Sequence, residues 1–341
     1  MEGIGRGSAK LILFGEHAAV HGHPAVGVSL PESTTVRLAD RPGHGGHGSP
    51  WHSDDWDLAS VAESDRETVA AVIARLGELV PGVAPAGVQV ESEVPRAAGF
   101  GSSAALCTAF ARAVSARSPR MGLPRLEEEV DTLWRLAHEL EKLFHGTPSG
   151  IDTGLSIREG TYAFHPRPGS LPAVERLPGA LPALVVGAVP REGSCGALVA
   201  DLSRRVRGGD AAAIRSVDAL GGMAQAAAHA LRPRTAGTAR LLGELADRAM
   251  EVLRGLGLSV PGLDALLDVG KRAGALGGKL SGAGGGGAFY LVAPDDDAAV
   301  EIARRVGDEA AWMGIRLVSG PRVRETRAPS AARSWPRAPR W

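Results

Sequence analysis

The chain has 341 residues, 44% of them hydrophobic and 22% charged, which is enough apolar material to bury a core in one large domain or two smaller ones. Its 38 lysines and arginines balance its 38 aspartates and glutamates, so it lacks the basic excess with which proteins bind nucleic acid or anionic membranes. The unusual count is 46 glycines, and only their placement can show whether they line ligand-binding loops.

The two cysteines, Cys107 and Cys195, are too few and too scattered for a disulfide framework or a zinc site. The N-terminus lacks the long apolar run of a signal peptide, and no stretch of about 18 apolar residues could span a membrane. We therefore expect a cytoplasmic protein.

In the first half of the chain, runs at 9–14 and 25–30 read as buried strands, and runs at 33–39 and 87–94 alternate as half-buried strands do. Helices are expected at about 65–79, 103–117 and 125–144. The last of these carries apolar residues at three- and four-residue steps, namely Leu126, Val130, Leu133, Ala137, Leu140 and Phe144.

A stretch rich in proline and glycine at 165–182 predicts a domain boundary, which divides the chain into a domain at 1–180 and a domain at 181–327. The second domain is expected to contain a strand at 183–189, helices to about 275, strands around a second glycine cluster, a helix at about 296–309 and a strand at 315–319. A disordered tail is expected at 328–341. The loop at 43–57, with His44, His47 and His52, is interpreted as solvated rather than metal-binding.

The segment RAAGFGSSAA (96–105) combines three features of an anion-binding loop. Gly99 and Gly101 permit a tight turn, the turn opens a helix whose first N–H groups are unpaired, and Ser102 and Ser103 place hydroxyls at that terminus. A plain glycine turn with serine caps explains this segment equally well. Its spacing excludes a Walker loop and a dinucleotide-binding loop.

Two acidic residues in EKLFHGTPSGIDTG (141–154) are candidates for chemistry. Glu141, at a helix end, can bind a hard cation together with Ser103, and Asp152, beyond a Gly/Pro turn, can accept a proton from a hydroxyl. Lys10 begins a third segment, KLILFGEHAAVHG (10–22), and can pair with Asp152. Each residue alone is more often an ordinary surface or strand-edge side chain.

The fourth segment, GGKLSGAGGGG (277–287), has more glycines than an ordinary hairpin needs. In order and approximate spacing over residues 8–320, the segments at 95–105, 279–287 and 10–22 resemble the three signature motifs of the GHMP kinase superfamily. The segment at 95–105 and the sequence HGTPSGID (145–152) resemble its mevalonate kinase family in particular. The resemblance implies a two-lobed α+β fold, with the active site between an N-terminal lobe like ribosomal protein S5 domain 2 and a C-terminal ferredoxin-like lobe.

The resemblance also implies ATP-dependent phosphorylation of the C5 hydroxyl of mevalonate, with Mg²⁺ as cofactor. Asp152 would be the base and Lys10 would stabilise its charge and the γ-phosphate; Ser103 and Glu141 would bind the metal. The loop of Ala98, Gly99, Phe100, Gly101, Ser102 and Ser103 would hold the ATP phosphates, assisted by Gly282, Ala283 and Gly284. Phosphoryl transfer of this kind depends on positioning and charge neutralisation.

On the acceptor side the resemblance places Glu16 and His17. The sequence departs from the family pattern at Ser194 and Cys195, where the family has a threonine, and a thiol is a weaker hydrogen-bond partner than a hydroxyl. Arg191 is a candidate for the cation that the carboxylate of mevalonate requires. Homodimers are frequent in the family, so a homodimer is an open expectation.

Two alternatives remain at this point. One is another small-molecule kinase of the same superfamily, acting on phosphomevalonate, a sugar or a different alcohol. The other is a catalytically inactive member that senses a small molecule, which the joint presence of Lys10, Ser103, Glu141 and Asp152 disfavours.

Overall fold

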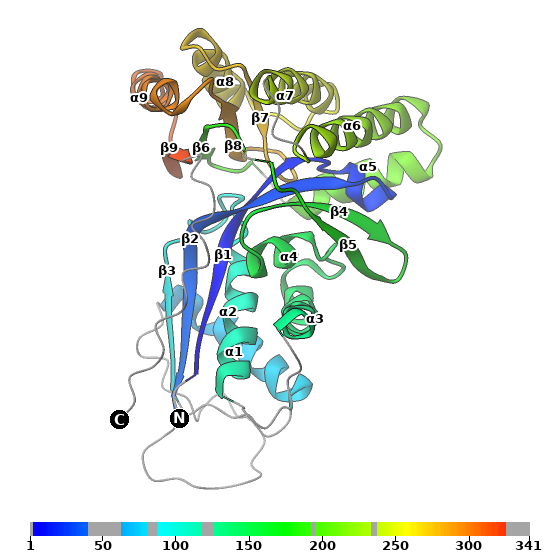
Figure 1. Ribbon diagram of the computed structural model, residues 1–341, viewed down its shortest axis with the longest axis vertical. Coiled ribbons are helices and arrows are strands. Elements are labelled where there is room, and N and C mark those ends of the chain that lie inside the picture. Colours follow the sequence, from blue (N-terminus) through cyan, green and yellow to red (C-terminus); the bar gives the residue numbers. More distant parts are fainter. Residues whose placement is uncertain are drawn as a thin grey trace, which may run out of the picture.

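The computed structural model describes residues 3–39, 63–80, 87–117, 126–179, 181–192, 195–232 and 237–324, and two lobes lie one above the other (Figure 1). The predicted tail at 328–341, the loop at 43–57 and Ser194 lie outside the described residues. No helix in the described part of the chain is long and apolar enough to cross a membrane.

The N-terminal lobe is built on an antiparallel sheet in which β1 (Gly3–Phe14), β2 (Ala25–Ala39), β4 (Thr161–Arg167) and β5 (Ser170–Arg176) follow one another, and β3 (Gly87–Ser92) pairs with the far half of β2. Four helices pack against it or against one another and enclose a buried apolar cluster. They are α1 (Glu63–Leu79), α2 (Ser102–Arg117), α3 (Leu126–His145) and α4 (Ile151–Ile157).

Close packing of α2 on β1 explains two of the glycines. A Cβ on Gly5 would lie 2.0 Å from the carbonyl oxygen of Ala109, and one on Gly7 would lie 2.0 Å from that of Ala105. Both distances are impossible for real atoms, so β1 needs glycine wherever the helix backbone touches it. This contact holds the N-terminal end of α2, where the first glycine loop lies, against the strand that carries Lys10.

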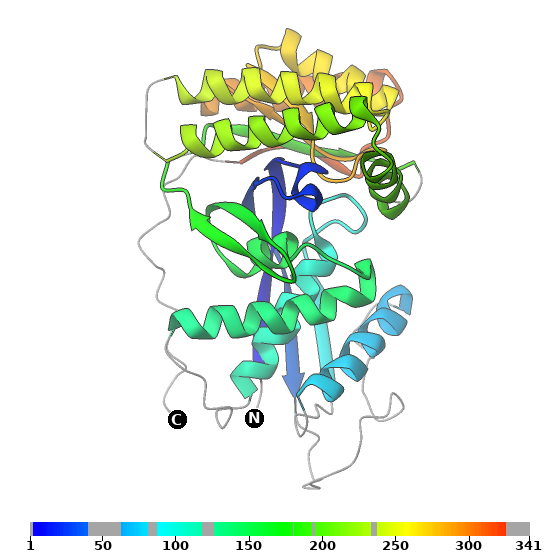
Figure 2. The ribbon, with the colours of Figure 1, turned by 90° about the vertical axis from the view of Figure 1, so that its right-hand side faces the viewer.

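The C-terminal lobe contains a four-stranded antiparallel sheet in the order β7 (Gly277–Leu280), β8 (Gly287–Val292), β6 (Leu184–Val189), β9 (Ser319–Arg324). Within the lobe this is the strand order 2-3-1-4 of a ferredoxin-like fold. Five helices accompany it, and α6 and α7 run side by side, with α7 packed on β7 and β8 and α6 packed on the ends of β1 and β2 in the N-terminal lobe (Figure 2). They are α5 (Cys195–Arg207), α6 (Ala211–Ala230), α7 (Thr238–Gly255), α8 (Pro261–Arg272) and α9 (Asp296–Trp312).

The predicted two-lobed α+β fold is confirmed, and most of the predicted elements agree with it. One apolar cluster runs from the ends of β1 and β2 into the second lobe, so the lobes share a core instead of meeting only through side chains at a surface. The predicted domain limits at 1–180 and 181–327 are not tested by this and stay a prediction, but the chain does pass from one sheet to the other between β5 and β6.

Three local predictions were wrong or incomplete. The stretch from 165 to 182 is not merely a linker, because β4 ends in it and β5 lies within it; the prolines hid a hairpin at the edge of the sheet. The strands expected at 25–30 and 33–39 form one strand, β2, that continues through Pro31. The last strand lies at Ser319–Arg324 rather than 315–319.

Candidate active site

Lys10 and Asp152 meet at the centre of the predicted site. Lys10 projects from β1 and is 4% exposed, and its Nζ lies 3.2 Å from Oδ2 of Asp152. The same Nζ donates a hydrogen bond to the carbonyl oxygen of Gly99 at 3.2 Å. Asp152 lies in the first turn of α4 with about a third of its side chain exposed. The pair therefore joins a buried cation to a carboxylate that a substrate can still reach.

The first glycine loop wraps over Lys10. Gly99 and Gly101 have φ angles of 93° and 75°, in the left-handed region that favours glycine, and the backbone N–H of Lys10 donates to the carbonyl of Phe100. A Cβ on Gly101 would lie 2.7 Å from Cε of Lys10. The side chains of Ala98 and Phe100 are fully buried. The loop is thus anchored by its apolar residues and leads into the N-terminus of α2, where N–H groups can bind an anion.

Ser103 and Glu141 form the predicted metal-binding pair. Ser103, in the first turn of α2, donates from Oγ to Oε1 of Glu141 at 2.8 Å. Glu141 is 1% exposed, and its second oxygen, Oε2, is buried with no hydrogen-bond partner in the described part of the chain. A buried carboxylate oxygen without a partner is costly, and hard cations prefer oxygen ligands, so the pair fits a divalent cation.

Two further side chains contact Glu141 that the sequence analysis did not assign to the site. His145 lies one helical turn later with Nε2 3.2 Å from Oε1, and a hydrogen bond to Glu141 together with the charges of Glu141 and Asp152 raises the pKa of this histidine. Cys107 is fully buried on α2, where burial and the charge of Glu141 raise the pKa of its thiol. The family motifs hold His145 only as part of a turn sequence, so its contact with Glu141 could be found only in three dimensions.

The glycine-rich segment at 277–287, called the third glycine segment from here on, contacts the N-terminal lobe at two further points. Ser281 is fully buried and its Oγ accepts from the backbone N–H of Ile12 at 3.1 Å, while Nε2 of His17 lies 3.1 Å from the carbonyl oxygen of Ala283. Because a carbonyl only accepts, the neutral His17 carries its proton on Nε2. Burial lowers the pKa of His17 to about 4, so it is neutral at pH 7.

Gly282 and Gly284 have φ angles of 90° and 85°, and a Cβ on Gly284 would lie 2.4 Å from the carbonyl oxygen of Leu258. Arg191 lies against both glycine loops: its Nη2 would be 3.0 Å from a Cβ on Gly99 and 3.2 Å from one on Gly287. The structure thus brings Arg191 beside the loops predicted to hold phosphate.

Glu16 is placed differently from the expected substrate-facing residue. Its side chain is 2% exposed and forms an ion pair with Lys279 of β7, whose side chain is fully buried. The contact with substrate predicted for Glu16 is untested, and what the structure adds is this buried partner. The side chain of Cys195, the first residue of α5, is not among those the structure describes.

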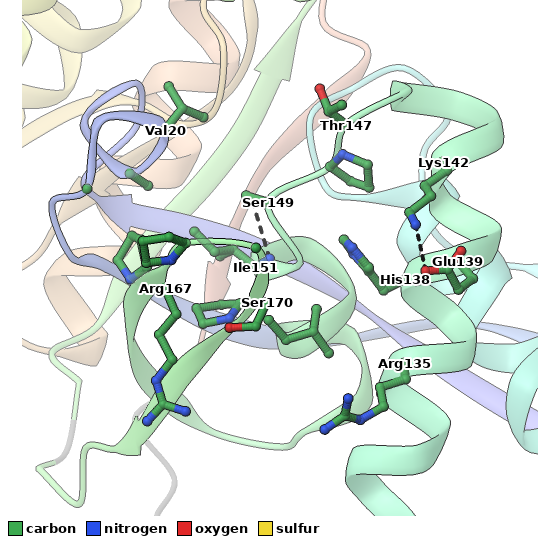
Figure 3. A pocket seen from close by; sticks show the side chains of 18 residues that line it. Val20, Arg135, His138, Glu139, Lys142, Thr147, Ser149, Ile151, Arg167 and Ser170 are labelled. Atoms are coloured by element: carbon green, nitrogen blue, oxygen red, sulfur yellow. Dashed lines mark hydrogen bonds and ion pairs between the residues drawn. The ribbon is translucent and has the colours of Figure 1, made fainter.

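Beside the site lies a pocket of about 840 Å³ that the sequence analysis did not predict. It is bounded by α3, the β4–β5 hairpin and the loop containing Ser149, and Arg135 and Arg167 project from its opposite sides (Figure 3). Lys142 also lines it but is paired with Glu139 at 2.6 Å. Ser149 and Ile151 line the pocket, and Ile151 immediately precedes Asp152 in the chain.

Comparison with known proteins agrees with the geometry. Residues 66–160 match the model of the GHMP kinases N terminal domain, and residues 224–311 match that of GHMP kinases C terminal. A mevalonate kinase of Thermococcus sibiricus is 31% identical, covering 87% of this chain and 91% of the relative, and one of Pyrococcus horikoshii is 32% identical, covering 87% and 90%.

Among solved structures, a mevalonate kinase of L. major crystallised with R-mevalonate superposes with a TM-score of 0.72. It is 24% identical, and the match covers 91% of this chain and 92% of that one. At this identity the likeness shows the fold, while the relatives above 30% identity carry the family assignment.

Proposed function

The chain belongs to the mevalonate kinase family of the GHMP kinases, and we propose that it transfers the γ-phosphoryl group of ATP to the C5 hydroxyl of mevalonate. The observation that carries the proposal is the ion pair of Lys10 and Asp152, 3.2 Å apart, beside the first glycine loop, which leads into Ser103 and its partner Glu141. Base, cation and metal ligands are thereby gathered on the elements that surround the first glycine loop.

In the proposed reaction Asp152 accepts the proton of the C5 hydroxyl of mevalonate. The C5 oxygen forms a bond to the γ-phosphorus of ATP, and the bond between the γ-phosphorus and the oxygen of the leaving ADP breaks. Lys10, which is held by Gly99 and Asp152, faces both the carboxylate and the incoming phosphate. Its positive charge would offset the negative charge of the transferring phosphate. No covalent intermediate on the protein is needed, since positioned groups and charge neutralisation supply the rate.

The nucleotide phosphates would be held by N–H groups of the first glycine loop and the start of α2, with Arg191 and the Gly282–Gly284 turn on the other side. Ser103 and Glu141 would bind Mg²⁺, which offsets the charge of the β- and γ-phosphates when bound. Among the described residues, no group of three or more histidine, cysteine, aspartate or glutamate side chains is arranged to hold a metal ion.

Two arginines are candidates for the acceptor's carboxylate. Arg191 is the one predicted from sequence, while Arg167 lines the pocket that adjoins the turn of Asp152. If Arg167→Met raises the KM for mevalonate and leaves the KM for ATP unchanged, the carboxylate lies in the pocket. The same result for Arg191→Met assigns it to Arg191. A homodimer remains a prediction that sedimentation of the purified protein can test.

The test of the proposed function is ADP release with mevalonate, phosphomevalonate, galactose and homoserine as acceptors. Turnover on mevalonate at a kcat/KM well above the others supports the proposal. Turnover only on a different acceptor would overturn the substrate assignment and keep the kinase, and binding of ATP with no turnover on any acceptor would favour a sensor.

A further inference from the structure

The ion pair between Glu16 and Lys279 connects the two lobes in a fully buried position. Glu16 belongs to the turn after β1, and Lys279 lies on β7, 263 residues later in the chain. Their side chains are 2% and 0% exposed, and the ammonium lies 5.9 Å and 5.5 Å from the ring centres of Phe14 and Tyr290. Lys279 also donates to the carbonyl of Leu280 at 2.6 Å.

Burying two charges so deeply needs an explanation, because it removes both from water. Burial raises the pKa of Glu16 and lowers that of Lys279, while their mutual attraction opposes both shifts. Pairs of this kind contribute little net stability compared with apolar side chains of similar volume, but they fix geometry, since either charge alone is strongly destabilised. Stability by itself is therefore a poor reason for these two residues here.

The pair is one of four contacts along a line that we call the lobe seam. In the others, the N–H of Ile12 donates to Ser281, Tyr290 Oη donates to the carbonyl of Leu13 at 2.7 Å, and His17 bonds the carbonyl of Ala283. On one side of the seam stand the end of β1 and the turn that follows it, and on the other the third glycine segment and β8. The strand that carries Lys10 and the turn that carries His17 are thus held against the C-terminal lobe by the same set of contacts.

These contacts matter for His17 because its backbone has φ 59°, a left-handed conformation that residues other than glycine adopt only when the surrounding structure stabilises it. Its neighbour Glu16 forms the ion pair with Lys279 of β7, and the ring of His17 hydrogen-bonds the carbonyl of Ala283 in the glycine turn. These two contacts stabilise the left-handed backbone of His17. Without Glu16, the hydrogen bond of His17 to Ala283 is the remaining side-chain contact that the structure gives between these two residues and the third glycine segment, while the turn keeps its own backbone hydrogen bonds and the buried side chain of Ala18.

We propose that Glu16 and Lys279 are positioning residues, which set the place of the acceptor-side turn relative to the third glycine segment without contacting a substrate themselves. The inference rests on the proposed function for the roles of His17 and the glycine turn. It assigns to Glu16 an action through His17 in place of the direct substrate contact expected from sequence. Loss of the pair should weaken acceptor binding and alignment more than ATP binding.

The test compares the Glu16→Leu/Lys279→Met double variant with the parent and with a control that combines Glu301→Leu and Arg304→Met. The double variant removes both charges together and leaves no buried charge alone. The Glu301→Leu/Arg304→Met control also removes an acidic and a basic partner, but from an exposed ion pair on α9, 2.8 Å long and outside the seam. Thermal unfolding, KM for each substrate, kcat and amide hydrogen exchange are measured for all three proteins.

We expect the double variant to unfold near the parent temperature, to raise the KM for the acceptor about tenfold or more and to keep the KM for ATP within about twofold. Hydrogen exchange should quicken at residues 12–18 and 279–284 and stay at the parent rate there in the Glu301→Leu/Arg304→Met control. Parent kinetics in a double variant of parent stability would overturn the proposal, as would an equal loss of affinity for both substrates.

Two safeguards keep the result decisive. If the double variant does not fold, Glu16→Asp, which keeps the charge but shortens the carboxylate by one methylene, replaces it with the same expected split of KM values. If the parent turns over a different acceptor, the substrate assignment fails while the seam is tested with that acceptor. Faster exchange on both sides of the seam together with unchanged kinetics would mean a purely structural pair and would refute the positioning role.

Discussion

Replacing Asp152 by asparagine tests the chemistry most directly, because it removes the base and its charge while keeping the shape of the side chain. Lys10 is 4% exposed, and once the carboxylate 3.2 Å away is gone, its Nζ keeps the hydrogen bond to the carbonyl of Gly99 among the described residues. A positioned general base contributes about 10²–10⁴-fold to a rate, so we expect kcat to fall by roughly that factor.

The KM for ATP should change by less than about threefold, because the phosphate-binding N–H groups belong to the first glycine loop and α2 rather than to α4. ADP release at saturating mevalonate measures kcat, and titration of ATP against the purified variant measures its binding. The matched control is Asp201→Asn, an exposed aspartate paired with Arg204 on α5. A kcat for Asp152→Asn within about fivefold of the parent would refute the base assignment, because among the described residues Asp152 is the carboxylate that forms an ion pair with Lys10.

Three further perturbations follow from the site. Gly101→Ala places a Cβ at φ 75° and 2.7 Å from Cε of Lys10, so it should lower kcat, whereas Gly209→Ala, at φ 80° with open space around it, should show only the backbone cost of about 1–2 kcal/mol in urea unfolding; equal kcat in the two variants would contradict the contact with Lys10. Glu141→Gln should raise the Mg²⁺ concentration for half-maximal ADP release about tenfold or more, while Glu139→Gln on the same helix should not, and an unchanged requirement would remove Glu141 from the metal site. The pKa of His17 is about 4 in the folded protein and 6.5 in the unfolded chain, so between these values the unfolded chain binds more protons and the free energy of unfolding falls as the pH is lowered. When the pH is lowered from about 7.5 to about 5.5, the parent should lose about 1 kcal/mol more stability than His17→Asn. An equal loss in the two proteins would show that His17 is not buried in its neutral form.

How much of this the sequence could predict depends on whether the signal is local. The glycines around Ser103, the turn before Asp152 and the strand beginning near Lys10 are short motifs, and each local pattern sufficed to name the residue. The β4–β5 hairpin was missed because Pro166 and Pro172 are ordinary signs of a linker. Only the pairing of β4 with β2 and of β5 with β4 shows that β5 is an edge strand.

The contacts that the sequence could not predict join residues far apart in the chain. Lys279 stands in a motif that was recognised for its glycines, and nothing in its neighbourhood indicates that it pairs with Glu16 across the lobes. Arg191 likewise is a lone arginine in a loop, and only the fold brings its guanidinium between Gly99 and Gly287. Long-range ion pairs have no periodicity or spacing of their own, so they become visible only when the strands that carry them are placed.

The neutral charge of the chain has a physical explanation in this arrangement. The buried charges at the site compensate one another locally, Lys10 with Asp152 and Lys279 with Glu16. Phosphate would then be bound mainly by N–H dipoles of the glycine loops, which add no net charge, and by a metal ion that arrives with the nucleotide. A site built from paired charges and backbone dipoles can hold anionic substrates without adding net positive charge, which agrees with the equal numbers of basic and acidic residues in the chain.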